Sequence, residues 1–512
     1  MRRSQLLENI FLIGGDLIML PFNPGGHAAY QNHVVTNLRK YYPNPSLIPK
    51  STWDIIERFF ALDLTQVDIL MKGRYSVFGP EPRLPSCMLR SDLLSLEFKI
   101  TSVTNWAAAM KTCPLYAFLS GFDVGDTPGV GTFYDFFDRL WISENDNFSP
   151  HLRQPKVKNV KNPGKKGSKA DPVEKTTVDE LLESLSLNPV SDDQPYSLLF
   201  HIYKEQFLDI SVQNGLVSLE RLSVSGDGTS VYTSSMERKK RICNCLDSGV
   251  RDCECNRYYS QPDCNTGWDS LWDCYYFGYN LYVLVDSASC SDLPVFPLFH
   301  PASRHDSHAF VYSFFTMKAF IPDCRVEKLL LDSAHDAMAI YEYCRKNKIS
   351  PFIDLNDKRG QKVKYKTDLL IDKRGIPYCP AGLKMRRDGP EPSKYRLKFR
   401  CPQMSRKYGN NCANPCSDAD FGRTVHLPVK DNPRLFNIPA RDTQEWKQIY
   451  NGRTSSERSN KRQKIDFLLE NGNHRSSKMW YCRLYCIMML QHLNAWGLSS
   501  EHSLKSLVTQ AA

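Results

Sequence analysis

Residues 219–356 alternate strand-like and helix-like segments, and this order constrains the fold more than any other feature of the chain. Three segments with strand patterning come first. A helical pattern, a short apolar strand, a second helical pattern and a further strand follow. The expected strands are LERLSV (219–224), YNLYVLVDSA (279–288), LPVFPLFHP (293–301), VEKLLL (326–331) and SPFIDLN (350–356). Strands alternating with helices in this way predict an α/β fold.

Two of these strands are expected to deliver an aspartate at their ends. The first strand breaks at Gly226-Asp227-Gly228, and the fourth runs directly into Asp332. Carboxylates at one edge of a sheet are suitable ligands for a hard divalent cation. Aspartate is also a common turn and capping residue, so neither position indicates catalysis when it is taken singly.

The stretch YNGRTSSERSNKRQK (450–464) carries charged groups at helical spacing. Tyr450, Arg453, Glu457 and Lys464 follow one another at steps of three, four and seven residues. Such steps return to one face of a helix. A carboxylate between two cations and a phenol suits a metal ion beside a polyphosphate. A solvated helix with ordinary charge pairs explains the spacing equally well.

The composition is that of a globular protein with a modest basic excess. The chain has 512 residues, enough for two to four domains, and Lys and Arg exceed Asp and Glu by ten. The excess is clustered in 156–169, 238–241, 384–400 and 453–464, which makes a polyanionic partner plausible, although each cluster alone fits a solvated surface. The sequence has neither a membrane-spanning pattern nor a clear signal peptide, so we expect a cytoplasmic location.

Two sets of cysteines are candidate zinc ligands. The 17 cysteines are an odd number in a chain that we expect not to be exported, which favours thiols or metal over disulfides. Four thiolates suit structural Zn²⁺, and reduced thiols without a ligand are the alternative. The first set, C-x-C-x(7)-C-x-C, comprises Cys243, Cys245, Cys253 and Cys255. The second set is more widely spaced and comprises Cys379, Cys401, Cys412 and Cys416.

The chain resembles bacterial insertion-sequence transposases of the DDE type, in the group with a Y-x(2)-R-x(3)-E-x(6)-K signature. Tyr450, Arg453, Glu457 and Lys464 match that signature without a gap. Further similar segments are SGDGT (225–229), LLLDSAHD (329–336), GFDVGDTPGVGTFYDFFDRLW (121–141) and HRSSKMWYCRLYCIMMLQHLNAW (474–496). The resemblance covers most of the chain from about residue 85 onward. It departs from the family at His335, where an aromatic residue is usual.

The resemblance implies an RNase H-like catalytic domain in which Asp227, Asp332 and Glu457 ligate two Mg²⁺ ions, with Mn²⁺ as an alternative. Hydrolysis at the transposon ends would free a 3′-OH, which would then attack target DNA. The phosphates near the scissile bond would be held by Tyr450, Arg453 and Lys464. The implied partners are double-stranded DNA, as terminal inverted repeats and target, and a second copy of the chain. Phosphate-binding glycine loops are absent from the sequence, so no nucleotide cofactor is expected.

The expected organisation has five parts. A helical candidate for binding DNA ends (1–150) precedes a basic linker (151–195). The RNase H-like domain begins in 196–356 with a Cys-rich loop (243–274), is interrupted by a β-rich insertion (357–440), and is completed by 441–512. Within the loop, the aromatic cluster around Trp268 and Trp272 is expected to be core rather than a base-stacking platform. Two alternatives stay open: a transposase-derived DNA-binding protein without catalysis, and a structural zinc protein.

Overall fold

The computed structural model describes residues 26–76, 78, 80–155, 175–235, 239–356, 363–365, 369–405, 409–410, 412–413, 415–497 and 504–509. The lysine-rich part of the expected linker, residues 156–169, lies outside these ranges. No helix within the described ranges has both the length and the apolar character needed to cross a bilayer.

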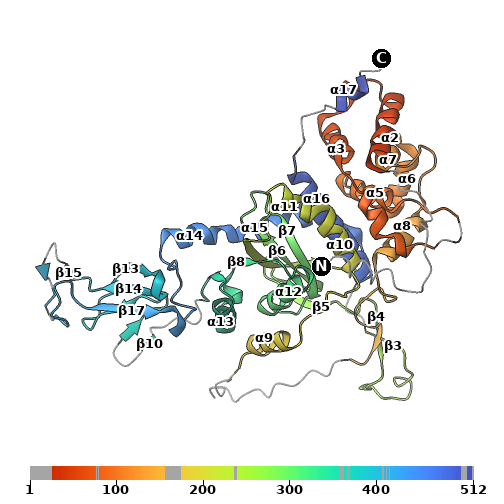
Figure 1. Cartoon of the computed structure of the whole chain (residues 1–512). Helices are drawn as coiled ribbons and strands as arrows, with labels where there is room; N and C mark the ends of the chain where they lie inside the picture. The colour runs from red at the N-terminus through yellow and green to blue at the C-terminus, as the bar shows by residue number, and fades with distance from the viewer. Residues whose placement is uncertain are drawn as a thin grey trace.

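A six-stranded mixed sheet forms the centre of the molecule (Figure 1). Its strands are β2 (Leu222–Tyr232), β5 (Asn265–Asp269), β6 (Cys274–Asp286), β7 (Pro294–Pro301), β8 (Val326–Leu331) and β9 (Ser350–Ile353). The order across the sheet is β7-β6-β2-β8-β9, and β5 pairs with the beginning of β6. Strands β2, β6 and β7 are antiparallel neighbours, whereas β8 and β9 run parallel to β2. The predicted α/β fold is therefore confirmed.

Two helices make the crossover connections of this sheet. Helix α12 (Asp306–Phe320) joins β7 to β8, and α13 (Met338–Lys346) joins β8 to β9. Parallel neighbours require such crossovers, which is why the apolar strands of this region alternate with helices in the sequence. From Gly278 to Asp286, every residue of β6 is buried. A strand buried on both faces is typical of a sheet with helices on both sides.

The helices that precede the sheet share one hydrophobic core with it. The main ones are α2 (Gly26–Tyr41), α3 (Lys50–Ala61), α5 (Pro85–Glu97), α6 (Val103–Thr112), α7 (Pro114–Ser120), α8 (Val130–Leu140) and α10 (Ser197–Tyr203). The long helix α16 (Ser477–Ala495) packs against α5, α8 and α10 and is buried along almost its whole length. The core therefore continues across the predicted boundaries at 150 and 196.

Residues 363–428 form a β-rich unit that projects from the sheet (Figure 1). Its strands are β10 (Val363–Tyr365), β11 (Leu369–Ile371), β12 (Pro377–Tyr378), β13 (Arg386–Glu391), β14 (Arg396–Arg400), β15 (Met404–Ser405), β16 (Gly409–Asn410) and β17 (Thr424–Pro428). They make three small sheets and have their own hydrophobic core, which includes Phe399 and Phe436. The β-rich composition predicted between Asp332 and Glu457 is thus present.

Three local predictions were wrong. Strand β2 does not stop at Gly226 but continues to Tyr232, because its pairing with β6 runs unbroken from Val224 to Tyr232. Residue preference predicts Ser303 as the cap of the helix after residue 301, but α12 is capped by His305, whose ring nitrogen accepts the Ser307 N–H. The same preference predicts Thr132 as the N-cap within 129–141, but Gly129 precedes α8.

Candidate functional site

Asp227 lies in the middle of β2 and not at the end of a strand, with Val283 of β6 opposite it. Glycines on either side keep its surroundings open. A Cβ atom at Gly228 would lie 2.4 Å from Asp306 Oδ1 and 2.6 Å from Asn280 Oδ1. Asn280 donates a hydrogen bond of 2.8 Å to the same Asp306 oxygen. The glycine therefore lets a carboxylate at the start of α12 approach the strand that carries Asp227.

Asp332 follows β8 directly, as the sequence predicts, and caps a short 3₁₀ turn. Its Oδ1 accepts hydrogen bonds from the Ala334 N–H at 3.0 Å and from His335 Nδ1 at 2.6 Å. Burial opposes ionisation of Asp332, but the His335 hydrogen bond, the His335 charge and the positive charge of Arg453 outweigh it, so the pKa of Asp332 is lowered. Asp332 is therefore a carboxylate with a fixed orientation.

His335 is a buried support for Asp332. It is 1% exposed and lies between Asp332 and Tyr282, whose hydroxyl is 2.8 Å from His335 Nε2. His335 Nδ1 is directed at the Asp332 carboxylate, and Nε2 is within hydrogen-bond distance of the Tyr282 hydroxyl. Phe310 packs edge-on against the same ring. From its place in the second aspartate motif, His335 is expected to be a packing residue or a phosphate contact and not a metal ligand, and its burial favours packing.

Glu457 lies on α15 (Thr454–Lys461), which packs on β2. The contact depends on Ser225, whose hydroxyl is 2.7 Å from the Arg453 carbonyl oxygen and 2.9 Å from Ser456 Oγ. Gly452 completes the fit, because a Cβ there would lie 3.1 Å from Leu330 of β8. Arg453 Nη1 is 2.8 Å from Glu457 Oε1, so an ion pair holds the glutamate. The segment from 450 to 464, whose spacing predicts one helix, is not a single α-helix, because α15 begins only at Thr454.

The three predicted carboxylates share one electrostatic environment. Burial raises the pKa of Asp227 to about 7, and the negative charges of Asp306, Asp332 and Glu457 contribute to that rise. The positive charge of Arg453 helps to lower the pKa of Asp332, and the negative charge of Asp227 contributes to the raised pKa of Arg453. Within the described ranges, however, only the first cysteine set brings three or more ligand atoms within 4.8 Å of one another. The carboxylates therefore share one region of the sheet but are spaced more widely than a closed ligand shell.

Asp306 is a fourth acidic group that the sequence analysis missed. It begins α12, and an aspartate in the first turn of a helix is ordinarily explained by the helix dipole. Its contribution to the raised pKa of Asp227 is what distinguishes it. The stretch Arg304-His305-Asp306 has no residue spacing that could have identified it.

The remaining signature residues, Tyr450 and Lys464, lie on the helical segments on either side of α15. Tyr450 ends α14 (Gln444–Tyr450) and stacks on Trp446 at 4.7 Å, and the Arg453 guanidinium is 5.9 Å from the Tyr450 ring. Burial and the negative charge of Asp354 raise the pKa of Tyr450 to about 12, so it is a neutral phenol. Lys464 lies on a π-helical turn and donates to the Ser230 carbonyl oxygen at 2.6 Å, three residues along β2 from Asp227.

Two other cations of this segment are engaged elsewhere. Arg458 and Arg462 both pair with the buried Asp292, at 2.6 and 2.8 Å. They therefore anchor α15 to the loop after β6, and the basic cluster at 453–464 is in part an internal structural feature.

The first cysteine set forms a candidate metal centre. Sulfur atoms pair as Cys243 with Cys253 at 3.5 Å and Cys245 with Cys255 at 3.6 Å, and all four lie within 4.8 Å of one another. These separations are too long for a disulfide. They are close to the edge of a ZnS₄ tetrahedron, about 3.8 Å for Zn–S bonds of about 2.3 Å. The cluster could therefore hold a metal ion such as Zn²⁺.

Arg257 stabilises the thiolate form of one of these cysteines. Its Nη2 is 2.9 Å from Cys253 Sγ, and this hydrogen bond lowers the pKa of Cys253 to about 6. Hydrogen bonds from the neighbouring thiols, Cys255 first, raise the pKa of Cys245 to about 12. Metal binding at these cysteines would release the protons that their thiols still carry.

The second cysteine set is not brought together in the same way. Cys379 and Cys401 are buried in the β-rich unit, whereas Cys416 is exposed. Among the described residues, these four do not form a group within 4.8 Å. The structure therefore gives no support to a second zinc centre.

The aromatic cluster of the β5–β6 hairpin is mostly not core. Trp272 is 71% exposed and Tyr275 is 76% exposed, and Leu271 beside them is 81% exposed. Only Tyr276 is buried. The expectation of core was wrong because, within the described ranges, the pairing of β2 with β6 ends at Tyr232 and Gly278, so the hairpin from 268 to 276 extends past β2.

No protein-family model matches the chain, and no curated protein matches it.

Proposed function

We propose that this chain is a DNA transposase of the DDE type, with Asp227, Asp332 and Glu457 as its acidic triad. The observation that carries the proposal is the electrostatic proximity of the three carboxylates. They come from β2, β8 and α15, about 230 residues apart at the extremes, and yet their charges act together on Asp227. The order β7-β6-β2-β8-β9, with two parallel crossovers, agrees with the RNase H-like domain that the resemblance implies.

The donor set fits hard divalent cations. Mg²⁺ prefers carboxylate oxygens together with water and substrate phosphate, and Mn²⁺ accepts the same ligands. In this arrangement Asp227, Asp332 and Glu457 would supply the protein oxygens. A pair of such ions would activate water and stabilise the departing oxygen of the DNA strand.

The surrounding side chains prepare this donor set. His335 fixes the orientation of Asp332, and Arg453 holds Glu457 until a phosphate competes for its guanidinium. An arginine can bind phosphate through two parallel hydrogen bonds. Tyr450, as a neutral phenol beside Arg453, can donate a hydrogen bond to the same phosphate. Lys464 would contact a phosphate farther along β2, where it now binds the Ser230 carbonyl.

Cleavage of DNA that carries the element's own ends tests the proposal. The substrate is a duplex containing the inverted repeats that flank the reading frame, with Mg²⁺ or Mn²⁺. The intact chain is expected to nick it, and Glu457→Gln is expected to bind the ends but not to cleave them. Glu220→Gln, at an exposed glutamate just before β2, is the matched control and should cleave normally.

The outcomes separate the proposal from its main alternative. Normal cleavage by Glu457→Gln would refute the role of Glu457 as a metal ligand. Specific end binding without cleavage by the intact chain would favour a DNA-binding protein derived from a transposase. If the chain contacts several phosphates, raising the salt concentration from about 50 to about 200 mM should weaken its DNA binding by orders of magnitude.

A further inference from the structure

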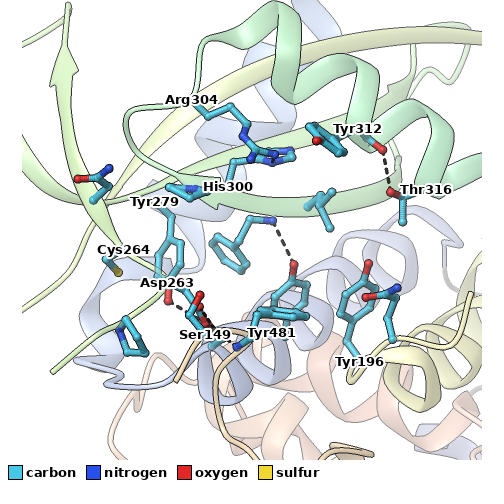
Figure 2. A pocket seen from close by; sticks show the side chains of 18 of the residues that line it. Ser149, Tyr196, Asp263, Cys264, Tyr279, His300, Arg304, Tyr312, Thr316 and Tyr481 are labelled. Carbon is cyan, nitrogen blue, oxygen red and sulfur yellow. Dashed lines mark hydrogen bonds between the residues drawn. The ribbon is translucent and has the colours of Figure 1, made fainter. Parts of the chain in front are cut away.

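A cavity of about 520 Å³ lies beside β7 (Figure 2). Its walls come from β7, α12, α16 and the segments 148–153 and 259–265, with the loop before α10 closing one side. Asp227, Asp332 and Glu457 are not among its lining residues. Small-molecule sites in proteins commonly have volumes of roughly 300–1,000 Å³, so this cavity is large enough for a ligand.

Arg304 supplies a positive charge to the roof of this cavity. Its guanidinium lies over the Tyr312 ring at 4.5 Å, and its Nη1 is 3.4 Å from His300 Nδ1. Burial lowers the pKa of His300 to about 3, so the ring is a neutral acceptor and adds no charge. Within the described part of the chain, no carboxylate forms a salt bridge with Arg304. Arg304 therefore keeps donors available for an anion.

Arg153 supplies a second positive charge. It donates to the Pro262 carbonyl oxygen at 2.6 Å and lies over the Tyr259 ring at 4.4 Å. The one acidic group in the lining, Asp263, already accepts bonds from the Phe148 and Ser149 N–H groups and from Ser477 Oγ. The cavity therefore has two guanidinium groups and one carboxylate, and that carboxylate already accepts hydrogen bonds from the protein. This balance of charge favours an anionic ligand.

Flat aromatic groups form much of the remaining wall. Tyr196 and Tyr481 are stacked at 4.6 Å with their planes 3° apart, and both are buried (Figure 2). Phe299 and Tyr279 extend the aromatic surface along the neighbouring strands. The Tyr196 and Tyr481 rings cover each other's faces, so the ring surface available to a planar ligand is that of the half-buried Phe299 and Phe277. A ring face stacks on a base without requiring a particular one.

We propose that this cavity binds a nucleoside monophosphate, with the phosphate at Arg304 and Arg153 and the base against the aromatic wall. The proposal does not depend on transposition. A free nucleotide and the 5′-phosphorylated end of a DNA strand share this chemistry.

Isothermal titration of the full chain tests this proposal. The probes are thymidine 5′-monophosphate, thymidine, inorganic phosphate and a 5′-phosphorylated dT octamer. The nucleotide is expected to bind at least tenfold more tightly than thymidine or phosphate alone. Tighter binding of the octamer than of the nucleotide would identify a strand end as the source, and the reverse would identify a free nucleotide. Failure of both to bind at millimolar concentration would overturn the proposal.

Substitutions in the cavity test whether the nucleotide binds there. Arg304→Gln should weaken nucleotide binding at least tenfold, whereas Arg221→Gln, an exposed arginine paired with Glu327, should leave it unchanged. Thr316→Met keeps the charges but narrows the cavity, and it should also weaken binding, so the test stands even if Arg304→Gln does not fold. Nucleotide binding that is equally tight in both cavity variants would contradict the proposal.

Discussion

Replacing Asp227 with asparagine should stabilise the metal-free protein, and should do so only at neutral and alkaline pH. In the folded chain the pKa of Asp227 is raised from 3.8 to about 7 by burial and by the charges of Asp306, Asp332 and Glu457. A raised carboxyl pKa means that the folded state holds its proton more tightly than the unfolded state does. The free energy of unfolding therefore falls as pH rises from about 4 to about 7.

The structure sets the size of this effect. The difference between 3.8 and about 7 corresponds to about 4 kcal/mol, lost once Asp227 is ionised in the folded protein. This figure is an upper bound, since Asp227 is partly exposed and water screens its charge. Asparagine has nearly the same shape and cannot ionise. Asp227→Asn should therefore gain about 1–4 kcal/mol at about pH 8 and almost nothing at about pH 4.5.

Urea unfolding with a chelator, from about pH 4.5 to about pH 8, measures this gain. Asp54→Asn is a suitable control, because it changes the same chemical group on the partly exposed surface of α3. It should show no comparable pH dependence. An Asp227→Asn variant that is no more stable than the intact chain at about pH 8, or whose advantage is the same at every pH, would refute the reasoning.

Three further predictions concern other parts of the molecule. Gly228→Ala should destabilise the fold by about 1–3 kcal/mol in urea unfolding, because its Cβ would displace Asp306 and Asn280, whereas Gly131→Ala in α8 meets open space and should cost nothing. One zinc per chain should be found by elemental analysis of the reduced protein; Cys245→Ser should lose it, and Cys290→Ser, outside the cluster, should retain it. His335→Phe should lower the thermal midpoint, because it removes the hydrogen bonds to Asp332 and Tyr282 and costs about 1–3 kcal/mol; an unchanged midpoint would mean that those bonds contribute little.

The sequence correctly predicted those elements in which the hydrophobic pattern matches the burial of the residues in the folded chain. Strands β7 and β8 begin and end within about two residues of their predicted bounds, and so does α16, for which the apolar face predicts a helix at about 477–495. Apolar runs and caps determine these elements locally. The β-rich unit was predictable from short strands separated by Gly, Pro and charged residues. Glu457 and Arg453 were placed on one helix face correctly, since an i,i+4 spacing is a local property.

Features that depend on distant partners were missed. The continuation of β2 past Gly226-Asp227-Gly228 follows from nine paired residues of β6, and a Gly-Asp-Gly triplet alone favours a turn. Asp306 gains its importance from Asp227, which lies 79 positions earlier in the chain. The exposure of Trp272 depends on where β2 ends, and the shared core of α16 with α5 and α8 depends on contacts almost 400 residues apart. Local propensity does not contain this information.

Binding of Mn²⁺, followed by electron paramagnetic resonance, tests the acidic triad most directly. The intact chain should bind Mn²⁺ with an affinity that rises with pH through about 7, as Asp227 loses its proton. Asp332→Asn and Glu457→Gln should each weaken that binding at least tenfold, and Asp54→Asn should leave it unchanged. Equal Mn²⁺ binding by the intact chain and the triad variants would contradict the assignment of these three carboxylates to one metal site.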